Sequence, residues 1–196
     1  ILFIASHRPG RSPSQRFRFE QYLSILQSSG YEYRFSYLLD QKDDRYFYAP
    51  GNYFRKVLIV LKSAFRRFVD VLQANRYDII FVQREAFMTG SSFFERMFSR
   101  SRAKLIFDFD DAIWLQDVSE ANKNLKWLKD TSKISRIIGY SDLIIAGNPY
   151  LSDYARQYNQ NVVIIPTTID TDEYSKQDVD RKDSDRVIIG WSGSIT

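Results

Sequence analysis

The sequence of 196 residues contains no cysteine and only one histidine, His7. The lack of cysteine excludes disulfide bonds and thiolate metal sites, and it suits a reducing cytoplasm. No apolar run approaches the ~20 residues that a membrane-spanning helix needs. Hydrophobic residues still make up 44% of the chain and aromatic residues 16%, which is enough for a substantial buried core. These totals exclude disorder and a disulfide scaffold, and we expect a folded cytoplasmic protein.

The formal net charge is a modest +4, but the basic residues are unevenly distributed. One group of arginines precedes the first acid, Glu20, and a second basic group lies between residues 55 and 76 around a single acid, Asp70. Such patches indicate an anionic partner such as a phosphate, a nucleotide or a lipid headgroup, or else a solvated basic face. The sequence has no recognisable nucleic-acid-binding module, so nucleic acid is not expected as a partner.

Short apolar segments with the length of strands alternate with longer segments of helical periodicity. The predicted strands cover residues 1–6, 31–38, 78–83, 104–109, 142–146 and 162–165. The predicted helices cover residues 15–29, 53–75, 93–100, 150–158 and most of 119–140, whereas 39–51 is polar and is predicted as a long loop. This alternation predicts an α/β protein with a Rossmann-like, doubly wound parallel sheet.

Two of the predicted helices carry features that the structure can check. Gly30 is placed as the C-terminal cap of the helix at 15–29. The helix at 53–75 has its large apolar residues on one side: Phe54, Val57, Leu58, Leu61, Phe65, Phe68, Val69 and Leu72. We expect most of this stripe to pack in the core.

The character of the sequence changes after residue 170. Residues 1–170 are predicted as one domain, and 171–186 are polar and densely charged, which is typical of a linker. Val187–Trp191 then reads as a strand, followed by the small residues Ser192, Gly193 and Ser194. We expect residues 187–196 to begin a second βα domain of which the rest is cut away; the alternative is a last strand on the edge of the first sheet.

Ligands of open α/β sheets bind at the carboxyl ends of the strands. The loop after the first strand lacks the GxGxxG pattern of dinucleotide-binding proteins. It supplies His7, Arg11, Ser14 and Arg16 as candidate substrate- or anion-binding residues near the start of a helix. Ser14 could alternatively be a plain N-cap, and Arg16 and Arg18 could be surface residues.

Further candidates follow the later strands. Gln83, Arg84 and Glu85 lie at the end of the third predicted strand and could bind a sugar or organise the cleft; alternatively, Arg84 and Glu85 form an ion pair with each other. Asn148 is a candidate for substrate binding, but it would also cap the next helix, with Pro149 as the first helical residue.

Three carboxylates, Asp108, Asp110 and Asp111, lie within four residues at the end of one strand. They would repel one another unless they are paired, protonated or bound to a metal. The alternation of side chains along a strand places Asp108 and Asp110 on the same side. One of them could accept a proton or anchor a hydroxyl; alternatively, the segment caps the next helix and pairs with the arginines of the first loop.

The block LIFDFDDAIW resembles the first motif of haloacid-dehalogenase-type phosphatases. This resemblance implies a magnesium-dependent phosphohydrolase with Asp108 as nucleophile and Asp110 as acid and base. Those enzymes carry the motif on their first strand, whereas three predicted strands precede it here. A stand-alone, non-catalytic α/β binding module is a further alternative.

The order of motifs along the whole chain resembles the N-terminal half of family 4-type GT-B glycosyltransferases. The matching blocks are SHRPGRSPSQRFR, FVQREAF, FDFDDAIW, SDLIIAGNPYL, VVIIPTTID and IGWSGSIT, in that order. The resemblance implies sugar transfer from a nucleotide-sugar donor to a sugar or lipid-linked acceptor in cell-surface polysaccharide or glycolipid synthesis. It implies a retaining reaction without a metal or a further cofactor.

The resemblance also implies which half of the enzyme binds the donor. The absent half would bind most of the donor, with Ser192, Gly193 and Ser194 opening its first loop, and the half present would be inactive alone. Many members carry a histidine in the acceptor pocket where this sequence has Asp110 and Asp111, which are our candidate catalytic residues.

In similar enzymes a cationic amphipathic surface of this half docks on an anionic membrane. The segment Tyr46–Arg76 is the candidate here, through Tyr46, Phe47, Tyr48, Tyr53, Phe54, Arg55 and Lys56. The protein would then be peripheral on the inner face of the membrane.

Overall fold

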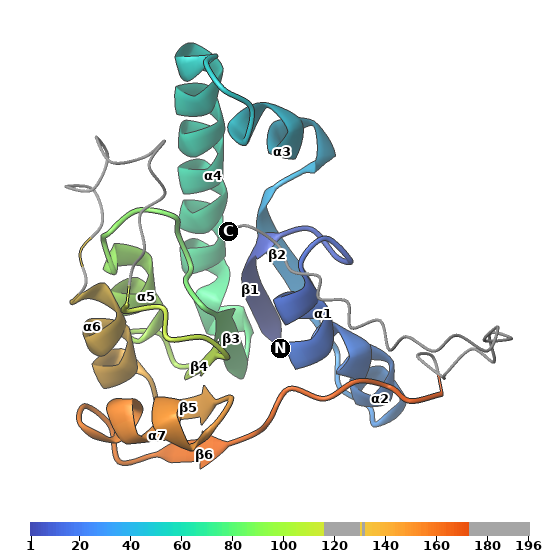
Figure 1. The fold of residues 1–196 in the computed structure, drawn as a ribbon, viewed down its shortest axis with the longest axis vertical. Helices are drawn as coiled ribbons and strands as arrows, with labels where there is room; N and C mark the ends of the chain where they lie inside the picture. The colour runs from blue at the N-terminus through green and yellow to red at the C-terminus, as the bar shows by residue number, and fades with distance from the viewer. Residues whose placement is uncertain (116–129, 131, 173–196) are drawn as a thin grey trace, which may run out of the picture.

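The computed structural model describes residues 1–115, 130 and 132–172 (Figure 1). The predicted strand at Val187–Trp191, the turn at Ser192, Gly193 and Ser194, and nearly all of the predicted linker lie outside these residues. The first part of the helix predicted at 119–140 also lies outside them. Within the described residues, no helix is both long enough and apolar enough to cross a bilayer.

Six strands form one sheet in which every neighbouring pair is parallel. They are β1 (Leu2–His7), β2 (Arg34–Leu39), β3 (Ile79–Gln83), β4 (Lys104–Phe109), β5 (Leu143–Ala146) and β6 (Val162–Ile164). Their order in space is β2-β1-β3-β4-β5-β6, so the direction of winding reverses between β1 and β3. This confirms the predicted Rossmann-like doubly wound α/β fold.

Helices cover both faces of the sheet (Figure 1). On one face, α1 (Pro13–Arg18) and α2 (Leu23–Ser28) pack through Phe19 and Leu23 against Phe3 of β1. The other face holds the larger core. It is covered by α4 (Tyr53–Gln73), α5 (Phe93–Phe98), α6 (Lys133–Tyr140) and α7 (Pro149–Arg156).

The single helix predicted at 15–29 is wrong in one respect, because it is interrupted. The backbone leaves the helical region at Phe19, where φ is −145°, and a 3₁₀ turn (Glu20–Tyr22) leads into α2. The break turns Phe19 inward, where it is buried and its ring stacks on Phe3 at a centroid distance of 5.0 Å. Gly30 has a φ of +86° and caps α2 as predicted. The Gly30 N–H donates to the carbonyl of Gln27, and the Tyr31 N–H donates to the carbonyl of Leu26.

The long loop predicted at 39–51 is also wrong, because it contains the helix α3 (Gln41–Phe47). Asp40 caps this helix: its carboxylate accepts hydrogen bonds from the backbone N–H groups of Lys42 and Asp43 at 3.0 and 2.9 Å. The helix is polar because it lies at the rim of the domain against α4, which explains why its sequence has no strong apolar period.

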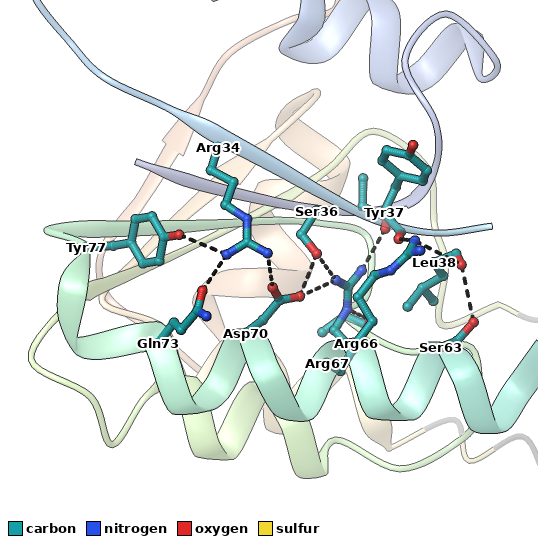
Figure 2. Close-up of polar contacts among 12 residues, drawn as sticks. Arg34, Ser36, Tyr37, Leu38, Ser63, Arg66, Arg67, Asp70, Gln73 and Tyr77 are labelled. Carbon is teal, nitrogen blue, oxygen red and sulfur yellow. Dashed lines mark hydrogen bonds and ion pairs between the residues drawn. The ribbon is translucent and has the colours of Figure 1, made fainter. Parts of the chain in front are cut away.

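The expected core packing of the apolar stripe of α4 is wrong. Apart from the half-buried Val69, the stripe faces solvent. The opposite side of the helix, with Ile59, Ser63, Arg67 and Asp70, is buried against the sheet. Figure 2 shows the reason, which is a polar network between α4 and β2. Arg67 is completely buried and donates to Ser36 at 2.8 Å, to Asp70 at 2.9 Å and to the carbonyl of Ala5 at 2.8 Å. These bonds fix which side of α4 faces the sheet.

Candidate functional site

The candidate site lies at the carboxyl ends of β1, β3 and β4, beside the point where the winding direction reverses. His7 ends β1, Gln83 ends β3, and Asp110 follows the last residue of β4. In parallel sheets of this kind, the loops at a reversal diverge and leave room for a ligand. The topology therefore brings three of the polar segments singled out in the sequence to one place.

Asp110 is the centre of a short chain of hydrogen bonds. The hydroxyl of Ser14, on α1, donates to Asp110 Oδ2 at 2.6 Å, and Gln83 Nε2 donates to the same hydroxyl at 2.8 Å. Asp110 Oδ1 is buried and has no hydrogen-bond partner among the described residues. Burying an unpaired carboxylate oxygen is costly, so this atom is positioned to accept a hydrogen bond from a ligand.

Gly147 makes room for Asp110. A Cβ atom at position 147 would lie only 3.0 Å from the Cα atom of Asp110, and the Gly147 N–H donates to the carbonyl of Phe109 at 3.0 Å. The contact is with backbone, which cannot swing aside as a flexible side chain could. The glycine therefore fixes how closely the β5–α7 turn approaches the end of β4.

Asp108 lies on the same side of β4 as Asp110, as the strand period predicts, and contacts Arg18 of α1. Arg18 Nε donates to the two carboxylate oxygens at 3.1 and 3.2 Å, and both side chains are buried. Burial raises the pKa of Asp108 to about 6, against the opposing effect of the guanidinium. The alternative in which these acids pair with arginines is thus confirmed for Asp108, and the surface position considered for Arg18 is wrong.

Arg18 also connects the site to the segment that follows β6. Its Nη1 group also donates a hydrogen bond to the carbonyl of Ile165. Nearby, Gln21 Nε2 donates to the carbonyl of Thr168 at 3.0 Å, and the hydroxyls of Tyr22 and Thr168 also bond. The described end of the chain is therefore held against α1 and the turn after it.

The loop after β1 is held in place by Gln15. Its side chain accepts from the His7 N–H and donates to the His7 carbonyl, both at 2.9 Å. The imidazole Nδ1 is buried without a partner among the described residues. Burial is the main cause of a lowered His7 pKa, and three nearby arginines lower it further while Asp44 opposes them. His7 is therefore neutral at pH 7 and available as a hydrogen-bonding group.

Arg11 lies at an open hollow beside this loop. Arg11 Nε and Arg8 Nη1 both contact Asp44 Oδ2, at 2.7 and 2.8 Å. The hollow has a volume of about 920 Å³ and is lined by Arg11, Asp40, Gln41, Lys42, Asp44, Arg45, Tyr48 and Ala49. Arg16, in contrast, lies with its guanidinium over the ring of Phe17 at 4.8 Å. The two arginines predicted as anion-binding thus have different surroundings.

Arg84 and Glu85 do not pair with each other. Arg84 contacts Asp111 at 2.9 Å, and Glu85 contacts Lys133 at 2.7 Å. The backbone of Arg84 is left-handed, with a φ of +65°, and its N–H donates to the carbonyl of Asp108 at 2.8 Å. A positive φ is strained for arginine, and strain of this kind is concentrated at ligand-binding sites. The Arg84–Asp111 pair is exposed at the mouth of the site.

Two candidates were also considered as helix caps, and the structure confirms one of them. Asn148 is the N-cap of α7, as considered from the sequence, because its side chain accepts from the Leu151 N–H at 3.0 Å. Ser14 is not an N-cap: α1 begins at Pro13, Ser12 occupies the cap position, and the Ser14 hydroxyl points to Asp110 instead. The predicted donor-loop residues Ser192, Gly193 and Ser194 lie outside the described residues.

Sequence reasoning assigned no site role to Gln15, Asp44 or Gly147, whereas Gln83 was a candidate for sugar binding and contacts Ser14 instead. One signal for a hidden pair was available, since Asp108 interrupts an apolar strand and a buried carboxylate needs a counter-charge. The partners themselves are far away in the sequence and follow only from the fold.

Comparison with protein-family models and with curated proteins gives no match to this chain. Among residues 1–115, 130 and 132–172, no three acidic, histidine or cysteine side chains are grouped as a metal ion would require.

Proposed function

We propose that this chain is the acceptor-side half of a two-domain GT-B glycosyltransferase that builds a cell-surface polysaccharide or glycolipid. The observation that carries the proposal is Asp110, a carboxylate at the winding reversal with one oxygen bound by Ser14 and the other buried without a hydrogen-bond partner among the described residues. The order of the sequence motifs supports the same reading. The donor would be a nucleotide sugar, bound mainly by a second domain.

In the proposed reaction, a hydroxyl oxygen of the acceptor forms a bond to the anomeric carbon of the donor sugar. The bond from that carbon to the diphosphate oxygen breaks, and the nucleoside diphosphate leaves with the bonding electron pair. Asp110 Oδ1 accepts a hydrogen bond from the acceptor hydroxyl and orients it for attack; the hydroxyl proton passes to this carboxylate or to the leaving diphosphate. In the retaining reaction of similar enzymes, attack occurs on the face that the diphosphate leaves.

The groups around Asp110 suit a polar, anionic substrate. Neutral His7 offers a hydrogen-bonding nitrogen, and Arg84 with Asp111 lines the exposed mouth. Arg11 borders the hollow beside the first loop, where a charged acceptor group can bind. We assign Asp110 the catalytic role and Asp111 that of holding Arg84.

The geometry gives less support to the phosphohydrolase alternative. That chemistry needs Asp108 as an accessible nucleophile, but both oxygens of Asp108 contact Arg18 in the interior. An attacking carboxylate would have to leave its counter-charge first. A residue so enclosed suits a structural ion pair better than a covalent intermediate.

The test uses the full-length protein with a panel of nucleotide sugars and a membrane-lipid extract of the source cells as acceptor. Release of nucleoside diphosphate that depends on the acceptor is the expected result. Asp110→Asn keeps the shape and the bond from Ser14, and we expect it to lower turnover by about 10²-fold or more. Asp153→Asn, at an exposed position of α7, is the matched control and should be fully active.

Two outcomes would contradict the proposal. Turnover that is unchanged in Asp110→Asn would remove this residue from the reaction. Magnesium-dependent hydrolysis of a phosphate ester that is lost in Asp108→Asn would establish the phosphohydrolase instead.

A further inference from the structure

The loop that follows β3, residues 84–89, is held by charged side chains from three helices. Ala86 is completely buried; its N–H donates to Glu95 of α5 at 2.9 Å, and its carbonyl accepts from Arg67 of α4 at 2.6 Å. Arg67 is the residue whose other hydrogen bonds fix α4 on the sheet (Figure 2). The third helix, α6, contributes Lys133. All three charged side chains are buried, so the loop is held from the interior of the domain.

The ammonium group of Lys133 is enclosed by the same loop. Its Nζ atom donates to the carbonyls of Phe87 and Thr89 at 2.6 and 2.7 Å and to Glu85 Oε2 at 2.7 Å. An ammonium group has three N–H donors, and here all three bind one loop. Lys133 is only 3% exposed. The loop therefore closes around a cation that the protein itself supplies from α6.

Helix formation and core packing do not explain a lysine at this position. Lys133 is the first residue of α6, where the partial positive charge of a helix N-terminus disfavours a cation. Removing an ammonium group from water is costly, and a well-packed apolar side chain in such a place is often at least as stable. What the lysine adds is the set of hydrogen bonds that fixes residues 85–89.

The fixed loop determines the backbone of Arg84. Its φ of +65° is strained for a residue other than glycine, and such strain persists only where the surroundings impose it. On one side, the Arg84 N–H donates to the carbonyl of Asp108 at 2.8 Å. On the other side, Glu85 is bound to Lys133. From this fixed backbone the guanidinium reaches Asp111, with 2.9 Å between Nη2 and Oδ2.

We infer that Lys133 is a positioning residue, which holds Arg84 in its left-handed conformation through residues 85–89 and thereby places the guanidinium at the mouth of the candidate site. The consequence for the reaction rests on the proposed function, in which Arg84 lines that mouth for an anionic substrate. The consequence for the loop is measured without any substrate, so the two can fail separately.

Amide hydrogen exchange, followed by NMR on the 196-residue chain, tests the loop. Lys133→Met keeps a long side chain and removes its donors. We expect the N–H groups of Arg84 and Ala86 to exchange at least about tenfold faster than in the unchanged chain, while those of β1 and β5 keep their rates. A general loss of stability would accelerate the amides of β1 and β5 as well. In that case Glu85→Gln, a milder change at the same contact, should accelerate Arg84 and Ala86 alone.

The matched control is Lys104→Met, which makes the same change at an exposed lysine. Lys104 is the first residue of β4, at the opposite end of the strands from Arg84, and pairs with Asp142 at 2.8 Å. This variant also loses a lysine ion pair, but it should leave the exchange of Arg84 and Ala86 unchanged.

Chemical rescue separates the hydrogen bonds of the ammonium group from the volume of the side chain. In Lys133→Ala, we expect ethylammonium to occupy the space of the missing atoms, to donate to the same three oxygens and to slow the exchange of Arg84 again. Tetramethylammonium at the same concentration has the same charge but no N–H donor, and it should have no effect.

Kinetics of the full-length protein with the nucleotide sugar and the lipid extract test the consequence for the reaction. Lys133→Met should raise KM for one of the two substrates at least about tenfold and change kcat by less than about threefold, because Arg84 would bind that substrate equally in the ground state and the transition state. A purely structural defect would reduce the amount of folded enzyme and so the apparent kcat, and would leave KM unchanged.

The outcomes distinguish this inference from the proposed function. If neither Lys133→Met nor Glu85→Gln accelerates Arg84 and Ala86 beyond the amides of β1 and β5, the inference is overturned. Equal effects of the two cations, or unchanged KM values in an active enzyme, would also overturn it. Absence of turnover in the unchanged full-length protein would contradict the proposed function alone, and the exchange rates would still decide the role of Lys133.

Discussion

Arg18 and Asp108 are 90 residues apart in the sequence and form an ion pair buried between α1 and β4. The pair neutralises the first of three closely spaced carboxylates at the end of β4. Asp110 and Asp111 can then lie nearby with other partners, Ser14 and Arg84. The pair thus separates a structural carboxylate from the two that face the candidate site.

The buried Asp108 makes stability depend on pH. Its folded pKa of about 6 lies above the unfolded value near ~4, so the folded state holds the proton more tightly between these values. This contribution to the free energy of unfolding is complete below about pH 4 and declines by up to about 3 kcal/mol as the pH rises through 6. Urea unfolding of the unchanged chain and of Asp108→Asn at several pH values measures it. The variant should lose this part of the pH dependence, and an identical profile would contradict the assignment.

The close approach of Gly147 to Asp110 predicts a clear difference between two glycines. Gly147→Ala should cost about 1–3 kcal/mol of unfolding free energy, because the new methyl group meets backbone at 3.0 Å. Gly139→Ala, in α6, meets nothing within 4 Å and should stabilise the helix by about 0.5–1 kcal/mol. Urea unfolding compares the two. Equal effects would show that the turn can move away from Asp110.

The orientation of α4 predicts that its polar side stabilises the fold more than its apolar side. Arg67→Met would leave the buried carboxylate of Asp70 without its buried counter-charge, and should lower the free energy of unfolding by about 3–5 kcal/mol. Phe65→Ser, on the exposed apolar stripe of α4, should change the free energy of unfolding by less than about 0.5 kcal/mol apart from helix propensity. Chemical denaturation distinguishes them, and a larger loss in Phe65→Ser would mean that the stripe is buried after all.

The unexpected helix α3 depends on its cap. Asp40→Ala removes the oxygen that accepts from the N–H groups of Lys42 and Asp43, and should cost about 1 kcal/mol. Asp40→Asn keeps a capping oxygen and loses only the charge that contacts Lys62. The asparagine variant should therefore unfold at a higher urea concentration than the alanine variant. Equal midpoints would assign the effect to the ion pair.

The sheet could be predicted from sequence because its strands are buried on both faces. β4 (Lys104–Phe109), for example, is apolar except for Lys104 and Asp108 and is followed by polar residues, and the predicted bounds match those observed. The orientation of α4 could not be predicted, because the hydrophobic period says which residues share a side and not where that side points. The orientation is determined by hydrogen bonds from Arg67 to Ser36 and to Ala5, which are 31 and 62 residues away in the sequence.

The candidate site was partly predictable for a similar reason. Asp110 and Ser14 were both identified from their places after strands. Their hydrogen bond joins positions 96 residues apart and depends on α1 beginning at Pro13, which the predicted helix start at residue 15 missed. The sequence marks polar residues at strand ends, whereas their pairing depends on the strand order and the packing of α1.

The contacts of Arg18 give the site a mechanical connection to the chain beyond β6. The Arg18 guanidinium that pairs with Asp108 also donates a hydrogen bond to the carbonyl of Ile165. Three residues further on, Thr168 is hydrogen-bonded to the side chains of Gln21 and Tyr22. Any displacement of residues 165–168 must either break these bonds or pull α1 with it. Ser14 and Arg18 are both on that helix. A movement of residues 165–168 would therefore change the hydrogen bonds of Asp108 and Asp110 at the same time.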